Sequence, residues 1–263
     1  MYSFRNATDR IKLMHRLIRD RVIQTDAERA LITTASSKRN EQVVPIIKRA
    51  RAAHDICAQM TVRVEDFEII VGNKAKSFLG SGVNPEWVGE GWIPAMVENG
   101  IWTLRDDGLY HNPDGEELKL TISPEDVEAL LSIRDYWKGK TITATADAWQ
   151  PDGYDELCRL NVCTNVPGAP LMMMTAGHLT PGFQKIINAG YASIRKLAQD
   201  WMDAHNNNLM GADVNKYMFY TAATIVCDAA TVLIKRYGQA CFEKAGECND
   251  RILEPDPPAK RPW

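Results

Sequence analysis

The chain has 263 residues, of which 45% are hydrophobic and 25% charged, proportions typical of a globular protein with one large domain or two small ones. Its 31 basic and 34 acidic residues give a formal net charge of -3 and form no basic stripe apart from Lys260 and Arg261, so nucleic acid is not an expected partner. No secretory signal opens the sequence, and a cytoplasmic location is expected. The six cysteines include no C-x-x-C pair and are expected to be reduced thiols.

The first third of the chain predicts three helices and one extended segment. Apolar residues recur at helical spacing from Arg10 to Ile23, and a second helix is expected to begin after Asp26. The third helix is expected from Val43 to Met60. From Val64 to Asn73 the pattern changes to a short apolar run closed by Gly-Asn, which predicts a buried extended segment followed by a turn.

The next stretch, from Lys74 to Thr121, is rich in turn signals and predicts a long ordered loop region or an insertion. Its aromatic content argues against disorder, because disordered segments are poor in aromatic residues; the tryptophans are Trp87, Trp92 and Trp102. A helix should then begin after Ser123, which is expected to cap it, and end near Trp137 and Gly139.

The stretch from Leu171 to Leu197 holds the first candidate functional residue, His178. An apolar run leads to a Gly-bounded corner at this histidine, and Thr180 as N-cap with Pro181 at the first helical position predicts a helix directly after it. One face of that helix is expected to be buried, namely Phe183, Ile186, Ile187, Gly190, Ile194, Leu197 and Trp201. The positive end of the helix would disfavour protonation of the imidazole, which could then donate or accept a proton. The alternative is a core histidine bonded to a neighbouring carbonyl.

From Val214 to Tyr237 the chain is apolar on most of its circumference and predicts a core helix. Asp228 interrupts it, and Lys216 and Lys235 bracket fewer apolar residues than the roughly 20 that a bilayer span needs, so no membrane partner is expected. A helix buried on all sides needs neighbours on all sides. The other predicted helices are too few to surround it.

Two further candidate sites carry weaker signals. Asp147 and Trp149 could line a substrate pocket, with the indole as an aromatic wall, although a tryptophan that covers a loop is the favoured interpretation. Cys158 and Cys163 could form half of a metal site with His178. Two further ligands at zinc-site spacing are missing, so buried thiols and no metal site are expected.

Five segments, in this order, resemble the N-terminal region of glycyl radical enzymes, the pyruvate formate-lyase-like superfamily. They are Glu28 to Ala52, Val64 to Asn73, Pro85-Glu86, Asp135 to Thr141, and Ala176 to Ile194. No single segment is specific, but the order and separations match across nearly the whole chain. The resemblance implies a barrel of ten strands in two half-barrels wrapped by helices. Residues 1–263 would be the N-terminal portion of this domain (the PFL domain), mainly α with short strands.

The resemblance also implies a chemistry. Such enzymes store a radical on a glycine of an R-V-x-G-Y type loop, installed by a radical SAM activating enzyme, and pass it to a cysteine that abstracts hydrogen from a small substrate. The nearest match to the loop, Asn188 to Tyr191, lies within a predicted helix, and no cysteine is followed by Val-Glu. The chain is therefore interpreted as a fragment of an oxygen-sensitive, anaerobic lyase that binds no cofactor itself and is inactive alone. Its expected partners are a small substrate, the missing C-terminal half or a complementary chain, the activating enzyme and, in a complete form, a second copy.

The Gly-His-x-x-Pro pattern at Gly177 to Pro181 matches a histidine that faces the substrate in dehydratase-type members, which favours the functional interpretation of His178. Two other hypotheses remain open. One is a non-catalytic helical scaffold or interaction protein derived from the fold, which would expose no apolar face. The other is a self-contained hydrolase or metal enzyme that uses His178 with Cys163. The substrate and the reaction are open as well.

Overall fold

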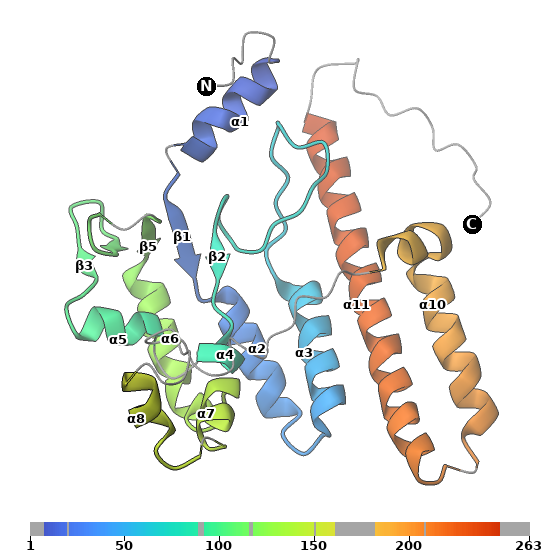
Figure 1. Ribbon diagram of the computed structural model, residues 1–263. Coiled ribbons are helices and arrows are strands. Elements are labelled where there is room, and N and C mark those ends of the chain that lie inside the picture. The colour runs from blue at the N-terminus through green and yellow to red at the C-terminus, as the bar shows by residue number, and fades with distance from the viewer. Residues whose placement is uncertain are drawn as a thin grey trace.

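The computed structural model describes residues 8–19, 21–88, 92–115, 118–149, 151–160, 182–207 and 209–247, and it is mainly helical with one small mixed sheet (Figure 1). The helices are α1 (Asp9–Arg19), α2 (Glu28–Arg39), α3 (Pro45–Gln59), α4 (Pro85–Val88), α5 (Trp92–Glu98), α6 (Pro124–Trp137), α7 (Ile142–Asp147), α8 (Tyr154–Arg159), α10 (Phe183–His205) and α11 (Ala212–Glu247). The strands are β1 (Ile23–Asp26), β2 (Ser81–Gly82), β3 (Thr103–Leu104), β4 (Tyr110–His111) and β5 (Leu120–Ile122).

The sheet has the order β2-β1-β5-β4-β3. β1 runs parallel to both β2 and β5, with Ile23 opposite Leu120, whereas β4 runs antiparallel to β3 and β5. The first predicted helix is wrong at its end, because α1 stops at Arg19 and Ile23 is the first residue of β1. A four-residue strand is too short for its alternation to stand out against a preceding helical pattern.

The main core lies between this sheet and the helices α2, α5 and α6. It consists of Ala27, Ala30, Ile93, Trp102, Ile122, Val127, Leu130, Ile133 and Trp137. The predicted cap of α6 is confirmed, since the Ser123 hydroxyl oxygen accepts a hydrogen bond from the backbone N–H of Asp126 at 3.1 Å. The region between residues 74 and 121 is ordered as expected in its described part, and it contains several short elements that the sequence pattern did not separate.

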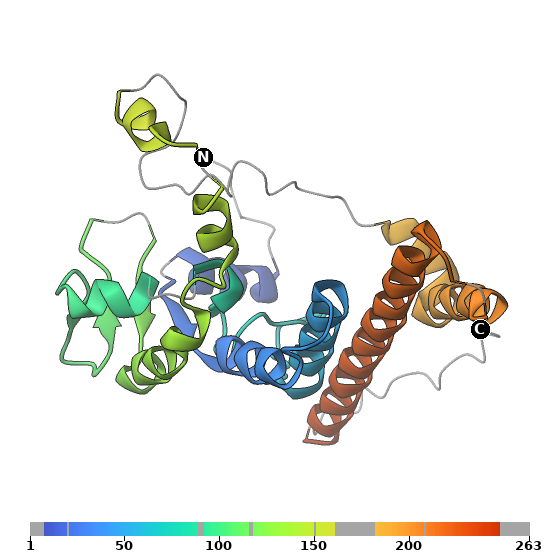
Figure 2. The same ribbon diagram turned by 90° about the horizontal axis from the view of Figure 1, so that it is seen from below.

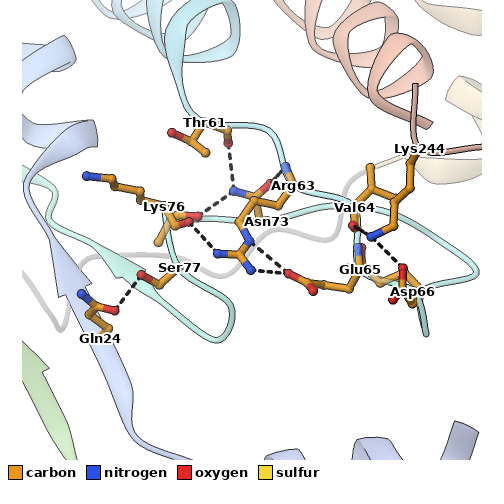
Figure 3. A network of polar contacts seen from close by, with 12 residues as sticks. Gln24, Thr61, Arg63, Val64, Glu65, Asp66, Asn73, Lys76, Ser77 and Lys244 are labelled. Carbon is orange, nitrogen blue, oxygen red and sulfur yellow. Dashed lines mark hydrogen bonds and ion pairs between the residues drawn. The ribbon is translucent and has the colours of Figure 1, made fainter. Parts of the chain in front are cut away.

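The prediction of a buried strand between Val64 and Asn73 is wrong. No strand occurs there, and Ile70 is 89% exposed. The segment is held by polar contacts instead (Figure 3). The Asn73 side chain accepts from the backbone N–H of Arg63 and donates to the carbonyls of Thr61 and Ala75, which fixes the loop as an irregular structure.

α11 is tied to the same loop by two of its residues and to the end of α3 by a third. Tyr237 hydroxyl and Asn73 are hydrogen-bonded to one another, and Lys244 Nζ donates to the Val64 carbonyl at 2.6 Å. Arg236 donates to the carbonyls of Cys57 and Met60 at 2.8 and 2.6 Å, and so caps the C-terminus of α3. These contacts hold the C-terminal part of α11 against the C-terminal end of α3.

α10 differs from its prediction in both its start and its burial. Its N-cap is Gly182, without a side-chain cap, rather than Thr180, and Gly190 kinks it with φ 70° and ψ 163°. Of the face expected to be buried, Phe183, Ile187 and Leu197 are exposed, whereas the residues that α11 covers best are Ala198 and Met202. The other four residues of that face, Ile186, Gly190, Ile194 and Trp201, are half-buried. The apolar periodicity is therefore present, but the described chain covers this face only in part.

α11 is buried only in part. It packs against α3 and α10, and Figures 1 and 2 show this side of the molecule lying apart from the sheet. Asp228, which interrupts the apolar run, pairs with Arg195 of α10 at 2.8 Å. Large apolar side chains elsewhere on the helix are exposed, namely Phe219, Val226, Ile234 and Phe242. The helix is long and apolar enough to cross a membrane by length and composition, a criterion that core helices of globular proteins also meet.

Asp26 is a buried carboxylate at the end of β1. It is 1% exposed, and its oxygens accept hydrogen bonds from the backbone N–H groups of Glu28 at 3.1 Å and Lys76 at 2.8 Å. Burial raises the pKa of Asp26 above its ordinary value, the two N–H groups oppose this shift, and the nearby Asp126 adds to it.

We expect Asp26→Asn to lower the free energy of unfolding by about 1–3 kcal/mol, because an amide NH₂ would face a backbone N–H. A carboxyl group whose pKa is raised in the folded state contributes its full stabilisation of the fold at pH values below its ordinary pKa. This contribution is lost as the pH rises through the folded-state pKa. In urea titrations, the difference in unfolding free energy between wild type and variant should therefore shrink as the pH rises from the ordinary carboxyl pKa through the higher folded-state pKa of Asp26. Asp106→Asn, at an exposed position, is the control. A difference that grows with pH would contradict the assignment.

Candidate functional site

The principal predicted site residue, His178, lies outside the described residues, as do Gly177, Thr180, Pro181 and Cys163. The role of His178 therefore stays a prediction from the sequence. The segment that carries it is followed at once by α10, whose first turn begins at Phe183.

Asp147 and Trp149 lie at the end of α7 and just after it. Asp147 is the last residue of the helix, and Trp149 is 84% exposed. The indole thus faces solvent in the described part of the molecule. An aromatic wall at this position would require a further segment packed against it.

The residues that the structure describes hold no group of three or more His, Cys, Asp or Glu side chains placed to bind a metal ion. Cys57, Cys227 and Cys241 are free thiols. Burial raises the pKa values of Cys57 and Cys227, so both thiols stay protonated at neutral pH. Neither Cys57 nor Cys227 therefore has the lowered pKa that marks a nucleophilic cysteine.

The segments that carry the resemblance pack against one another. Glu28, at the start of α2, accepts hydrogen bonds from the backbone N–H of Thr61 at 3.0 and 3.1 Å and from its hydroxyl at 2.5 Å. Trp137, at the end of α6, donates from Nε1 to the Thr34 hydroxyl at 2.8 Å. Lys140 pairs with Glu41 at 2.9 Å.

The contacts of Trp137 and Lys140 join the fourth segment to the first. Thr61 links the first segment to the second, because its carbonyl accepts a hydrogen bond from the Asn73 side chain, and Asn73 in turn joins the second segment to α11. The segments that carry the resemblance therefore form a structural scaffold. Sequence reasoning missed the roles of Asn73 and Arg236. The Gly-Asn turn at residues 72 and 73 was a local signal for the first, but nothing local predicts that an arginine 176 residues later donates to the Met60 carbonyl.

Comparison with known proteins agrees with this architecture. A profile of the family described as "Pyruvate formate lyase-like" matches residues 5–254. The chain is 26% identical over 233 residues to the isethionate sulfite-lyase of Desulfovibrio desulfuricans, and the match covers 86% of this chain and 26% of that protein. It is 25% identical over 243 residues to the (2S)-3-sulfopropanediol dehydratase of Klebsiella oxytoca, covering 90% of this chain and 27% of the relative.

Solved structures give the same result. The B12-independent glycerol dehydratase from Clostridium butyricum, in its glycerol-bound form, matches with a TM-score of 0.74 at 25% identity, covering 93% of this chain and 29% of that one. A structure from Roseburia inulinivorans, described for 1,2-propanediol dehydration, matches with a TM-score of 0.78 at 24% identity over 93% of this chain and 29% of its own. The chain thus spans about a quarter of the length of the curated relatives it matches. It belongs to the pyruvate formate lyase-like family of glycyl radical enzymes.

Proposed function

We propose that residues 1–263 are the N-terminal portion of the catalytic domain of a glycyl radical lyase, and that they act only together with the remaining portion. The observation that carries this proposal is the coverage, since relatives match 86–90% of this chain and only 26–27% of themselves. The relatives are named as a sulfite-lyase and a dehydratase that act on small hydroxylated compounds. A small hydroxylated substrate and cleavage of a C–O or other C–X bond are therefore proposed for the complete enzyme.

The exposed apolar surface of α10 and α11 supports the need for a further portion. Phe183, Ile187 and Leu197 on α10 and Ile234 and Phe242 on α11 are all exposed. A concentration of large exposed apolar side chains on two neighbouring helices favours an interaction site in a globular protein. The scaffold hypothesis predicted a molecule without such a face, so this surface counts against it.

Gly190 does not have the surroundings expected of the glycine that stores the radical. Gly190, the nearest sequence match, lies inside α10 at a kink, between helical residues on either side. The glycyl radical, where present, supplies the hydrogen abstraction that starts the reaction. The proposed contribution of this chain is to hold His178 next to the substrate, where the imidazole would transfer the proton of a hydroxyl group.

Reconstitution tests this function. The chain would be combined, under anaerobic conditions, with the polypeptide encoded downstream of it and a radical SAM activating enzyme, and the sample examined by electron paramagnetic resonance. We expect a glycyl radical signal and consumption of a diol or hydroxysulfonate substrate only in the combined sample. Turnover by the chain alone, or no radical in the combined sample, would refute the proposal.

A further inference from the structure

A cavity of about 610 Å³ lies where α2, α3, α4, α6 and α7 meet. Small-molecule sites usually have volumes of about 300–1,000 Å³ and mostly apolar walls with a few polar groups. The apolar part of this wall includes Ile56, Trp137 and Ile142, which belong to three different helices. The volume and the lining are therefore those of a site for a small molecule.

Unpartnered polar atoms are concentrated in this cavity. Arg29 Nε, Thr33 Oγ1, Glu86 Oε2 and the Tyr136 hydroxyl are buried, line it, and have no hydrogen-bond partner among the described residues. Thr33 is only 4% exposed. Buried polar groups are nearly always hydrogen-bonded in folded proteins, and an unmade bond costs about 1–3 kcal/mol. Four such atoms around one space indicate partners that come from outside the chain.

The charge of the lining favours an anion. The basic side chains are Arg29, Lys48, Arg49 and Lys140, and the acidic ones are Glu41 and Glu86. Lys140 is neutralised by Glu41 at 2.9 Å. Within the described ranges the other three cations form no ion pair, and Arg29 and Glu86 are too far apart to form one with each other. The cavity therefore carries surplus positive charge together with one unpaired acceptor.

We propose that this cavity binds a small organic anion that bears a hydroxyl group on an apolar body, in the manner of an aryl-substituted hydroxy acid. Arg29 and Thr33, one helical turn apart on the same face of α2, donate to the carboxylate. Glu86 Oε2 accepts from the ligand hydroxyl, and Trp137 and Ile142 contact the apolar body. The inference stands on these residues alone and is independent of the reaction proposed above.

Isothermal titration of the purified chain with 3-phenyllactate tests the site. Two comparison ligands each remove one interaction: 3-phenylpropionate lacks the hydroxyl group, and 3-phenyllactamide lacks the charge. We expect saturable binding of 3-phenyllactate, weaker binding of 3-phenylpropionate, and a loss of about tenfold or more for the amide, the factor that corresponds to one charge-assisted hydrogen bond.

Thr33→Val and Ser36→Ala form a matched pair of variants. Both remove a buried hydroxyl without a partner from α2, but Ser36 does not line the cavity. In the absence of ligand both should unfold at the same or a higher temperature than wild type, because each removes an unsatisfied group. Thr33→Val should weaken binding of 3-phenyllactate about tenfold, and Ser36→Ala should leave it unchanged.

A Thr33→Val variant that is at least as stable as wild type but binds 3-phenyllactate more weakly is expected only if Thr33 belongs to a binding site. A purely structural threonine would not lower affinity when its replacement stabilises the fold. No saturable heat with 3-phenyllactate at millimolar concentration, equal affinity for acid and amide, or equal affinity of wild type and Thr33→Val would each overturn the proposal.

Discussion

Replacement of Trp137 by alanine is expected to lower the free energy of unfolding by about 3–5 kcal/mol. The side chain is 5% exposed and belongs to the main core. Its Nε1–H donates to the Thr34 hydroxyl at 2.8 Å, and that hydroxyl donates in turn to the Ala30 carbonyl at 2.7 Å. The loss therefore combines a large cavity with one buried hydrogen bond.

Two variants separate these contributions. Trp137→Phe keeps most of the apolar volume and removes the hydrogen bond, and the bond itself should account for about 1 kcal/mol of its loss. Trp149→Ala removes an indole that is 84% exposed and should change stability by less than about 0.5 kcal/mol. Urea denaturation followed by far-ultraviolet circular dichroism measures all three. Similar losses for Trp137→Ala and Trp149→Ala would contradict the core assignment.

The second large effect concerns activity. In the complete enzyme, His178→Ala is expected to lower kcat/KM by about a hundred- to ten-thousand-fold, the usual contribution of a positioned proton donor or acceptor. The glycyl radical signal should persist, because the imidazole acts on the substrate and not on radical storage. Loss of turnover with the radical retained is thus the signature of this role.

His205→Gln is the matched control for His178→Ala. This histidine is exposed at the end of α10 and stacks on Trp201 at 4.3 Å between ring centroids. Its replacement should leave kcat/KM within about twofold of wild type, as is usual for surface substitutions. If both variants lose activity equally, or if His178→Ala remains active, the proposed proton transfer is wrong.

Long helices with local signals could be predicted from the sequence. α3 follows from its apolar spacing, and α6 from Ser123 with Pro124 and the acidic first turn. The strands could not be predicted, because each has only two to four residues and depends on pairing with segments far away in the chain. The buried strand expected before Asn73 was wrong for a related reason, since the Asn73 side chain provides partners that periodicity does not reveal.

The burial of α10 and α11 shows a different limit. Their apolar residues predict partners on several sides. The described chain packs α10 against α11 and α11 against α3 and α10, and this leaves Phe183 and Phe242 exposed. The pattern of apolar residues on a helix reflects all the neighbours that pack against the helix in the complete protein. Similarly, the cavity beside Thr33 brings five helices together and has no signature in any single stretch of sequence.

The order of five weak segments indicated the family before any contact was known, and the family profile over residues 5–254 confirms it. The functional site could be predicted less completely from the sequence. A Gly-His-x-x-Pro pattern nominated His178, but the cysteine and the glycine loop that would give it a reaction do not occur in this chain.

The central claim is that this chain is one part of a radical lyase, and sequencing the genomic DNA beyond the codon for Trp263 tests it most directly. The account predicts an open frame, in the same gene or in an adjacent one, that encodes a cysteine followed by Val-Glu and, near its end, an R-V-x-G-Y loop. A genuine stop codon with neither element encoded nearby would contradict the claim and leave the chain without a radical mechanism.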